Sequence, residues 1–189
     1  MCGIAGFVGA GGHGDIAAMA RALIHRGPDA EGFYEAPAHR LFLAHRRLSI
    51  IDIDGGAQPM ANEDGAVRVV FNGEIYNHFE LRRELESRGH RFATDHSDTE
   101  VIVHGWEEWG EDMPARLNGM FALAVWDTRQ RCLFLARDRM GEKPLFWGRG
   151  KDVLLFGSEM SALAAHGGFA AEGDRGTLKK YFAHGFYPG

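Results

Sequence analysis

Hydrophobic positions in the first 30 residues change from a continuous run to a helical spacing. Residues 4–8 are apolar throughout, which is typical of a buried strand. Beyond a glycine-rich stretch, Ile16, Ala20 and Leu23 recur three to four positions apart, which predicts a helix. Residues 25–29, His-Arg-Gly-Pro-Asp, end this helix because proline cannot continue it. The chain is therefore predicted to open with a strand, a loop and a helix.

The middle of the chain repeats both patterns. Residues 41–53 and 67–76 are rich in β-branched and aromatic side chains, and we expect strands there. Residues 79–89 and 99–109 carry apolar side chains four positions apart, which places them on one face of a helix. Two strands and two helices are predicted in this part.

The last third begins with an expected hairpin. Residues 120–137 form two apolar runs around a turn at 127–130, and strands are expected at 144–147 and 153–156 before a short helix at 158–165. Strands joined by hairpins and helices grouped in pairs favour an α+β fold with largely antiparallel sheets.

Glycines mark a change in the chain after residue 167. They occupy positions 167, 168, 173 and 176, and residues 178–189 begin a helix or strand that the chain does not finish. We expect one domain over residues 1–168, with a linker and the start of a second domain over residues 169–189.

Composition and charge narrow the class of protein. Of 189 residues, 45% are hydrophobic and 25% are charged, as in an average folded protein. The net charge of −5, with no basic cluster, argues against binding to nucleic acid or to a membrane surface. No signal peptide or membrane span is recognisable, so the expected compartment is the cytoplasm. Cys2 and Cys132 are too few for a disulfide framework, and the ten histidines show no HxxxH spacing, so no metal site is expected.

One glycine pattern suggests a different function. Gly9-x-Gly11-x-x-Gly14 follows an apolar run and opens a helix, with Asp29 further on, as in a dinucleotide-binding oxidoreductase. However, Asp29 sits in the turn that ends the helix instead of at the end of a next strand. A loop that happens to be rich in glycine is the favoured interpretation.

Several motifs, in order, are similar to those of a known family. They are residues 1–6 (MCGIAG), 25–29 (HRGPD), 45–52 (HRRLSIID), 71–77 (FNGEIYN), 97–100 (SDTE), 119–122 (GMFA), 136–139 (ARDR) with 143–145 (KPL), and 156–159 (FGSE). With them the chain resembles the class II glutamine amidotransferase domain of glutamine-dependent asparagine synthetases over nearly its whole length. The resemblance implies a four-layer αββα sandwich of the N-terminal nucleophile hydrolase type. It also implies that residues 169–189 lead into an ATP-dependent synthetase domain that is otherwise absent from this sequence.

Cys2 is the nucleophile that the resemblance implies. If Met1 is removed, one residue offers both a thiol and a free α-amine. Reference pKa values of about 8.5 and about 7.7 to 8.0 make the transfer of a proton from sulfur to nitrogen cost only about 1 kcal/mol. If Met1 stays attached, a non-catalytic module that binds glutamine is the alternative.

Asn72 and Gly73 have two interpretations. Asn-Gly between apolar residues is the strongest short-range signal for a two-residue hairpin turn. The resemblance instead places both residues in an oxyanion hole, where the Asn72 side-chain amide and the Gly73 backbone N–H would act as donors.

A site for free glutamine should offer a cation for the α-carboxylate and a carboxylate for the α-ammonium. By resemblance, Arg47 binds the α-carboxylate, while Glu74 and Asp98 bind the ammonium. Ser97-x-x-Glu100 also matches a capping box, so a role in starting a helix is open for this segment.

Main-chain groups of Leu48, Ile50 and Ile51 are expected beside the substrate, again by resemblance. Arg46 is expected to be a solvated strand arginine, and Cys132 a small buried residue in mid-strand.

The implied reaction is hydrolysis of L-glutamine to glutamate and ammonia through a thioester at Cys2. The ammonia would serve an asparagine synthetase-like domain, and the alternative is a domain with a different carboxylate acceptor. No cofactor is expected for this chain, whereas ATP and Mg²⁺ belong to the synthetase domain. Expected partners are L-glutamine, the synthetase domain and a second copy in a homodimer, with no nucleic acid and no membrane.

Overall fold

The computed structural model describes residues 1–48, 57–172 and 174–186 and contains two antiparallel sheets. One has the strand order β2-β3-β1-β9-β8 and the other β4-β5-β6-β7. The strands of the first sheet are β1 (Gly3–Gly9), β2 (Ala30–Ala36), β3 (Leu41–Arg47), β8 (Phe146–Gly150) and β9 (Val153–Gly157). Those of the second are β4 (Met60–Ala61), β5 (Val67–Ile75), β6 (Gly119–Asp127) and β7 (Cys132–Arg137).

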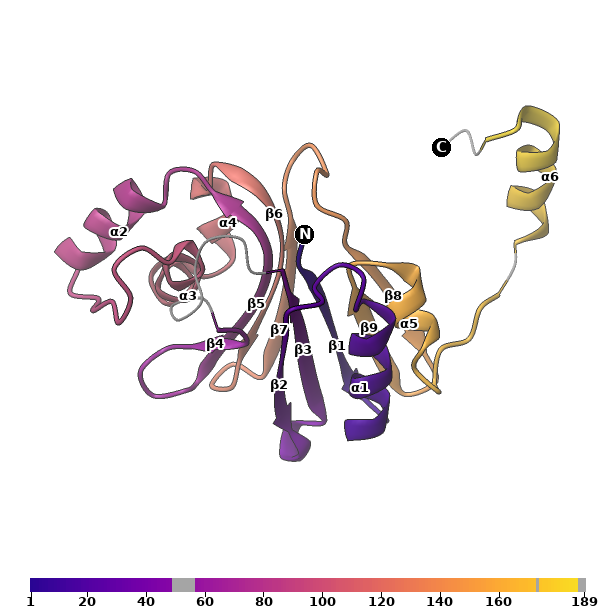
Figure 1. The fold of residues 1–189 in the computed structure, drawn as a ribbon, viewed down its shortest axis with the longest axis horizontal. Coiled ribbons are helices and arrows are strands. Elements are labelled where there is room, and N and C mark those ends of the chain that lie inside the picture. Colours follow the sequence, from indigo (N-terminus) through magenta and orange to yellow (C-terminus); the bar gives the residue numbers. More distant parts are fainter. Residues whose placement is uncertain (49–56, 173, 187–189) are drawn as a thin grey trace.

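Helices cover the outer face of each sheet (Figure 1). α1 (His13–Ala22) and α5 (Met160–Ala164) pack on the first sheet, and α2 (His78–Ser87), α3 (Asp98–Trp109) and α4 (Met113–Arg116) lie on the side of the second. Two 3₁₀ turns, η1 (Pro37–His39) and η2 (Gly110–Asp112), complete this body. The layers run helix, sheet, sheet, helix, which confirms the predicted α+β class and the αββα order that the resemblance implied.

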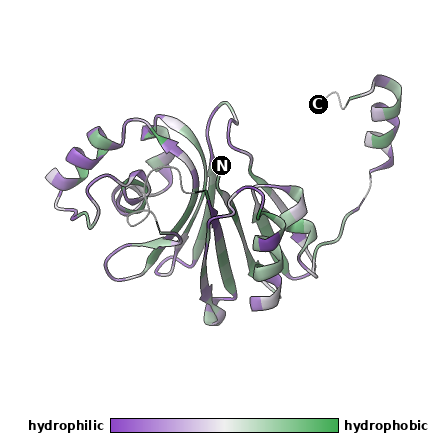
Figure 2. Ribbon diagram, viewed as in Figure 1, coloured by the Kyte–Doolittle hydropathy of each residue, from purple (hydrophilic) through white to green (hydrophobic). Residues whose placement is uncertain are grey.

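Three clusters of buried side chains hold the four layers together. Alternation along β5 shows how, since Val69 and Phe71 pack toward α3 whereas Val70 packs toward the first sheet. Ile4 and Phe156, both fully buried, meet Val70 in the cluster between the sheets. In Figure 2 the strands of both sheets are largely hydrophobic, while the helices have a mixed surface.

β1 lies in the centre of the first sheet, and hydrogen bonds join its first residues to the residue that follows β9. The Ile4 N–H donates to Ser158 Oγ at 3.0 Å, and the Ser158 N–H donates back to the Ile4 carbonyl at 2.8 Å. Ser158 is fully buried, so both bonds form away from water. The N-terminal end of the chain is thereby held beside the second sheet (Figure 1).

The hairpin-turn interpretation of Asn72-Gly73 is wrong. Both residues lie within β5, where Asn72 pairs with Ala122 and Gly73 with Phe121. A Cβ on Gly73 would lie 2.2 Å from the Met120 carbonyl oxygen, so glycine is needed for close strand contact and not for a turn.

The dinucleotide-binding interpretation is also wrong. Gly9 and Gly11 do adopt positive φ angles of 130° and 140° in the turn that leads to α1. However, β1 is antiparallel to both of its neighbours, β3 and β9, whereas the dinucleotide fingerprint belongs to a parallel βαβ unit.

Some boundaries differ from the predicted ones. β2 was not predicted, because residues 30–36 form a partly exposed edge strand with weak alternation. The strand expected from residue 144 begins at Phe146, and β3 ends at Arg47, with residues 49–53 of the expected strand outside the described residues.

α6 (Arg175–His184) stands away from the two sheets in Figure 1 and buries none of its residues. It is a helix, one of the two possibilities expected there, and its assignment to a second domain stays a prediction. Within the described ranges no helix is both long and apolar enough to cross a membrane.

Candidate active site

A cavity of about 320 Å³ opens where β1 begins, beside the end of β5 and the start of α3. Its described lining is Cys2, His45, Arg47, Gln58, Phe71, Gly73, Glu74, His78, His96, Ser97, Asp98 and Thr99. A larger hollow of about 660 Å³ is lined by Val8, at the other end of β1, and contains none of the predicted site residues. The cavity thus brings together five residues that the motifs singled out, from positions 2 to 98.

Arg26 holds the backbone of Cys2. Its Nε donates to the Cys2 carbonyl at 3.0 Å, and its Nη1 lies 3.1 Å from Glu159 Oε1. The Arg26 side chain is only 9% exposed, so this pair is screened little by solvent. Arg26, which follows the first helix of the chain, thus fixes the residue that carries the thiol.

The edge of β5 that faces away from β6 supplies backbone donors to the cavity. Successive N–H groups on one edge of an antiparallel strand come from alternate residues. The Phe71 N–H donates to Gln58 Oε1 at 2.6 Å, and the Ile75 N–H donates to Asp98 Oδ2 at 3.0 Å. The Gly73 N–H points to the same edge, between two side chains that both line the cavity.

Asn72 does not line the cavity, because alternation turns its side chain to the face of β5 that carries Val70. That face looks toward the first sheet, where β1 begins. Asn72 is 2% exposed, and its Nδ2 has no hydrogen-bond partner among the described residues. A buried amide donor without a partner costs free energy, so the Asn72 amide is available to donate to a bound group.

The cavity carries opposite charges. Arg47, the last residue of β3, supplies a cation, while Glu74 on β5 and Asp98 at the start of α3 supply carboxylates. Burial raises the pKa of Asp98, and the charge of Glu74 raises it further, against lowering by the Ile75 N–H and His78. Binding of an ammonium group would favour the ionised form of this carboxyl.

His45 is a cavity residue that the motif argument did not single out. Burial lowers its pKa from 6.5 to about 4, the charge of Arg47 adds to this effect, and a backbone hydrogen bond with Phe71 opposes it. His45 is therefore neutral near pH 7, and its buried Nε2 has no partner in the described part of the chain. Its position two residues before Arg47 in a strand, hence on the same face, was the available signal.

The capping box expected at Ser97 and Glu100 is not formed. Ser97 precedes α3 but makes no side-chain cap bond. Glu100 turns to the preceding loop instead, where it accepts the N–H groups of Ala93 at 2.6 Å and Thr94 at 2.9 Å. This segment therefore leaves Asp98 to face the cavity.

Two other expectations fail. Arg46 is 6% exposed instead of solvated, because its Nε donates to the Gly27 carbonyl at 3.0 Å and its Nη1 pairs with Glu31. Cys132 is the first residue of β7 and only partly buried.

The remaining candidates are residues 48, 50 and 51. Leu48 is partly buried but does not line the cavity, and Ile50 and Ile51 lie outside the described residues. Among the described side chains, the group close enough to share a metal ion is His90, His104 and Glu107, none of which lines the cavity.

Comparisons with known proteins identify the family of this chain. A family model described as a glutamine amidotransferase domain matches residues 1–189. Asparagine synthetase [glutamine-hydrolyzing] 3 of Bacillus subtilis (strain 168) is 44% identical over 88% of this chain and 27% of its own length. Asparagine synthetase [glutamine-hydrolyzing] 2 of Oryza sativa subsp. japonica is 45% identical over 87% of this chain and 28% of its own length. The chain thus spans little more than a quarter of these relatives.

A solved structure shows the same fold. The glutamine phosphoribosylpyrophosphate amidotransferase of B. subtilis, complexed with ADP and GMP, superposes with a TM-score of 0.71 at 21% identity, covering 87% of this chain and 43% of its own. The sandwich of two antiparallel sheets between helices is therefore a fold that this amidotransferase shares.

The buried His45 predicts a loss of stability in acid. Because its folded-state pKa lies below 6.5, the unfolded chain takes up a proton first, so stability is full above pH 6.5 and falls as the pH approaches about 4. At about 1.4 kcal/mol per pKa unit, the contribution is about 3 kcal/mol. Urea unfolding at several pH values should show a shallower acid loss for His45→Gln than for the wild type. The exposed His13→Gln should keep the wild-type slope, and an equal slope in all three proteins would contradict the assignment.

Proposed function

Because the chain belongs to the glutamine amidotransferase domain family, we propose that it hydrolyses L-glutamine to glutamate and ammonia through a thioester at Cys2. The observation that carries the proposal is the single cavity that joins the Cys2 thiol to Arg47, Gly73, Glu74 and Asp98. It offers a nucleophile, an oxyanion donor and both charges that a free α-amino acid requires.

The first half of the reaction forms the thioester. After removal of Met1, the α-amine of Cys2 takes the thiol proton, and the sulfur attacks the side-chain amide carbon of glutamine. The Asn72 amide and the Gly73 N–H stabilise the oxyanion that develops on the amide oxygen. The C–N bond then breaks, and ammonia leaves with the proton that the Cys2 ammonium returns to it.

The second half releases the product. A water molecule gives a proton to the Cys2 amine and attacks the thioester carbon, which yields glutamate and restores the thiol. His45 stays neutral in this scheme because of its lowered pKa, so it adds no charge beside the amine. Arg26 is a positioning residue, since it holds the Cys2 carbonyl and does not face the reacting atoms.

Charge complementarity supports the choice of substrate. Arg47 can pair with the α-carboxylate through two parallel N–H groups, a geometry that lysine cannot copy. Asp98 and Glu74 would face the α-ammonium, whose positive charge would offset the burial and the repulsion by Glu74 that raise the pKa of Asp98.

The names and lengths of the relatives support a proposal for the fate of the ammonia. They are named glutamine-hydrolysing asparagine synthetases and are more than three times as long as the matched segment, which covers 27% and 28% of two of them. We propose that ammonia passes to an ATP- and Mg²⁺-dependent synthetase domain with aspartate as acceptor. A different carboxylate acceptor is the alternative, since the acceptor would be chosen outside this chain.

Replacement of Cys2 tests the nucleophile. Cys2→Ala should abolish glutamate release from L-glutamine, whereas Cys132→Ala should retain it because that thiol lies on β7, outside the cavity. Intact mass spectrometry of the same samples should show that active protein lacks Met1. Full activity in Cys2→Ala, or in protein that keeps Met1, would exclude the proposed mechanism.

Replacement of Asn72 tests the oxyanion hole. Asn72→Ala should lower kcat about 10²- to 10³-fold with little change in KM, because the lost donor acts on the transition state. The exposed Asn118→Ala serves as the matched control. If Asn72→Ala changed only KM, the amide would have to act on bound substrate instead.

The pH dependence of glutamine binding tests the charge assignment. As the pH falls through the raised pKa of Asp98, this carboxyl becomes neutral, so kcat/KM should fall on the acid side. Asp98→Asn should lower kcat/KM and flatten that acid limb, while Arg47→Lys should raise KM at every pH. The exposed Arg83→Lys should match the wild type. An unchanged KM in Arg47→Lys would refute the carboxylate clamp.

A further inference from the structure

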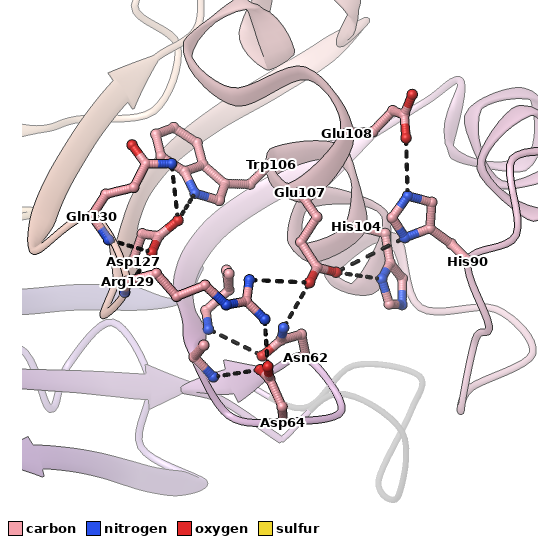
Figure 3. Close-up of polar contacts among 12 residues, drawn as sticks. Asn62, Asp64, His90, His104, Trp106, Glu107, Glu108, Asp127, Arg129 and Gln130 are labelled. Carbon is pink, nitrogen blue, oxygen red and sulfur yellow. Dashed lines mark hydrogen bonds and ion pairs between the residues drawn. The ribbon is translucent and has the colours of Figure 1, made fainter.

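Two histidines and a glutamate converge on the outer side of the second sheet, away from the cavity (Figure 3). His104 and Glu107 lie three residues apart on α3 and so share one face of the helix. His90 reaches them from the segment that follows α2. One ligand atom from each of the three lies within 4.8 Å of the others.

The distances suit a small divalent ion. His104 Nδ1 is 3.1 Å and His90 Nδ1 is 3.9 Å from the same oxygen, Glu107 Oε2. Ligand atoms about 2.0 to 2.1 Å from a tetrahedral zinc ion lie about 3.3 Å from one another. The three groups therefore need only small adjustments to share one ion.

The ring nitrogens of His90 and His104 that face away from Glu107 lie near carboxylates, as is common for histidines that bind a metal. A ligating imidazole commonly has a carboxylate at its second nitrogen, which sets the tautomer and the ring orientation. His90 Nε2 lies 3.3 Å from Glu108 Oε2, and His104 Nε2 lies 3.8 Å from Glu100 Oε1. Both rings thus direct one nitrogen to the shared point and the other to an acid.

Contacts on the outer side also orient the Glu107 carboxylate. Its Oε1 accepts from Asn62 Nδ2 at 2.7 Å and lies 3.8 Å from Arg129 Nη1. These contacts on one oxygen turn the other, Oε2, toward the two histidines, as Figure 3 shows. The carboxylate is therefore held before any ion arrives.

Burial and access also fit a binding site. The His104 side chain is 2% exposed, while those of His90 and Glu107 are each 17% exposed, so the group is sheltered but reachable. The centroids of the His90 and His104 rings are 5.1 Å apart, and carboxylate oxygens lie near both rings. Arg88 and Arg129 balance part of this charge through Glu108 and Glu107, but each contacts the oxygen that faces away from the histidines.

We propose that His90, His104 and Glu107 bind a divalent transition-metal ion of the zinc class, with water as the fourth ligand. Spacing rules missed the site because His90 and His104 are 14 residues apart and meet only through the packing of a loop on α3. The ion would fasten that loop to the helix. The loop continues to His96 and Ser97, which line the active-site cavity, so bound metal would steady one wall of it.

Zinc titration can test the site if the two thiols of the chain, which could bind Zn²⁺ elsewhere, are first removed. In a Cys2→Ala, Cys132→Ser background, calorimetry should detect one bound Zn²⁺ per chain. Co²⁺ in its place should give the visible absorption of a four-coordinate site. His90→Ala and Glu107→Gln should weaken Zn²⁺ binding at least about 100-fold, and Glu108→Gln about 10- to 100-fold, because it supports His90 from outside.

The matched control is His13→Ala. It also removes a histidine that pairs with a glutamate, since His13 Nδ1 lies 2.6 Å from Glu35 Oε1. It should leave Zn²⁺ affinity unchanged. Melting curves should show stabilisation by Zn²⁺ in the background and in His13→Ala, but not in Glu107→Gln, whose neutral isostere keeps the fold. The proposal would be overturned if the background protein bound no Zn²⁺, or if His90→Ala and Glu107→Gln bound Zn²⁺ as tightly as the background does. Neither result depends on glutamine hydrolysis.

Discussion

The site depends on how the first residues of β1 are held. The reciprocal hydrogen bonds between Ile4 and Ser158 fix the strand, and the Arg26 bond to the Cys2 carbonyl fixes the residue before it. A chain terminus would ordinarily fray, because few contacts offset the entropy of ordering it. Here the terminus begins a central strand, so the rigidity of the sheet extends to the thiol. The proposed chemistry needs this order, since the sulfur must meet the amide carbon of glutamine while the amine stays within reach of the leaving nitrogen.

The second requirement is an interrupted strand edge. Among the described residues, β4 pairs with the first part of β5, and beyond it the side chains of Gln58 and Asp98 accept from the N–H groups of Phe71 and Ile75. The side-chain oxygens of Gln58 and Asp98 thus act as the hydrogen-bond acceptors that a neighbouring strand would supply, and both residues line the cavity. This arrangement costs free energy of folding, because polar groups stay buried. Burial raises the pKa of the Asp98 carboxyl, and the Asn72 amide nitrogen has no hydrogen-bond partner within the ranges that the structure describes.

α3 connects the two sites. Its first residue, Asp98, faces the cavity, and the next turns carry His104 and Glu107 on the same rigid element. The loop before it closes on α3 through Glu100, which accepts the N–H groups of residues 93 and 94. An ion at His90 would add a second tie to that loop. The wall that carries the ammonium-binding carboxylate would then depend on contacts outside the cavity.

The sequence by itself determined most elements and much of the site. Periodicity predicted most of the strands and helices, and the motif resemblance selected residues such as Cys2 and Asp98, which share the cavity. At Asn72-Gly73 two signals in the sequence conflict, a strand over residues 67–76 and a turn at the Asn-Gly pair. The tertiary structure decided for the strand, because pairing along β6 outweighs the local preference for a turn. It also decided the buried state of His45 and the meeting of His90 with α3. Local rules compare neighbours a few positions apart, whereas burial and convergence join segments that are distant in sequence and adjacent only after the layers pack.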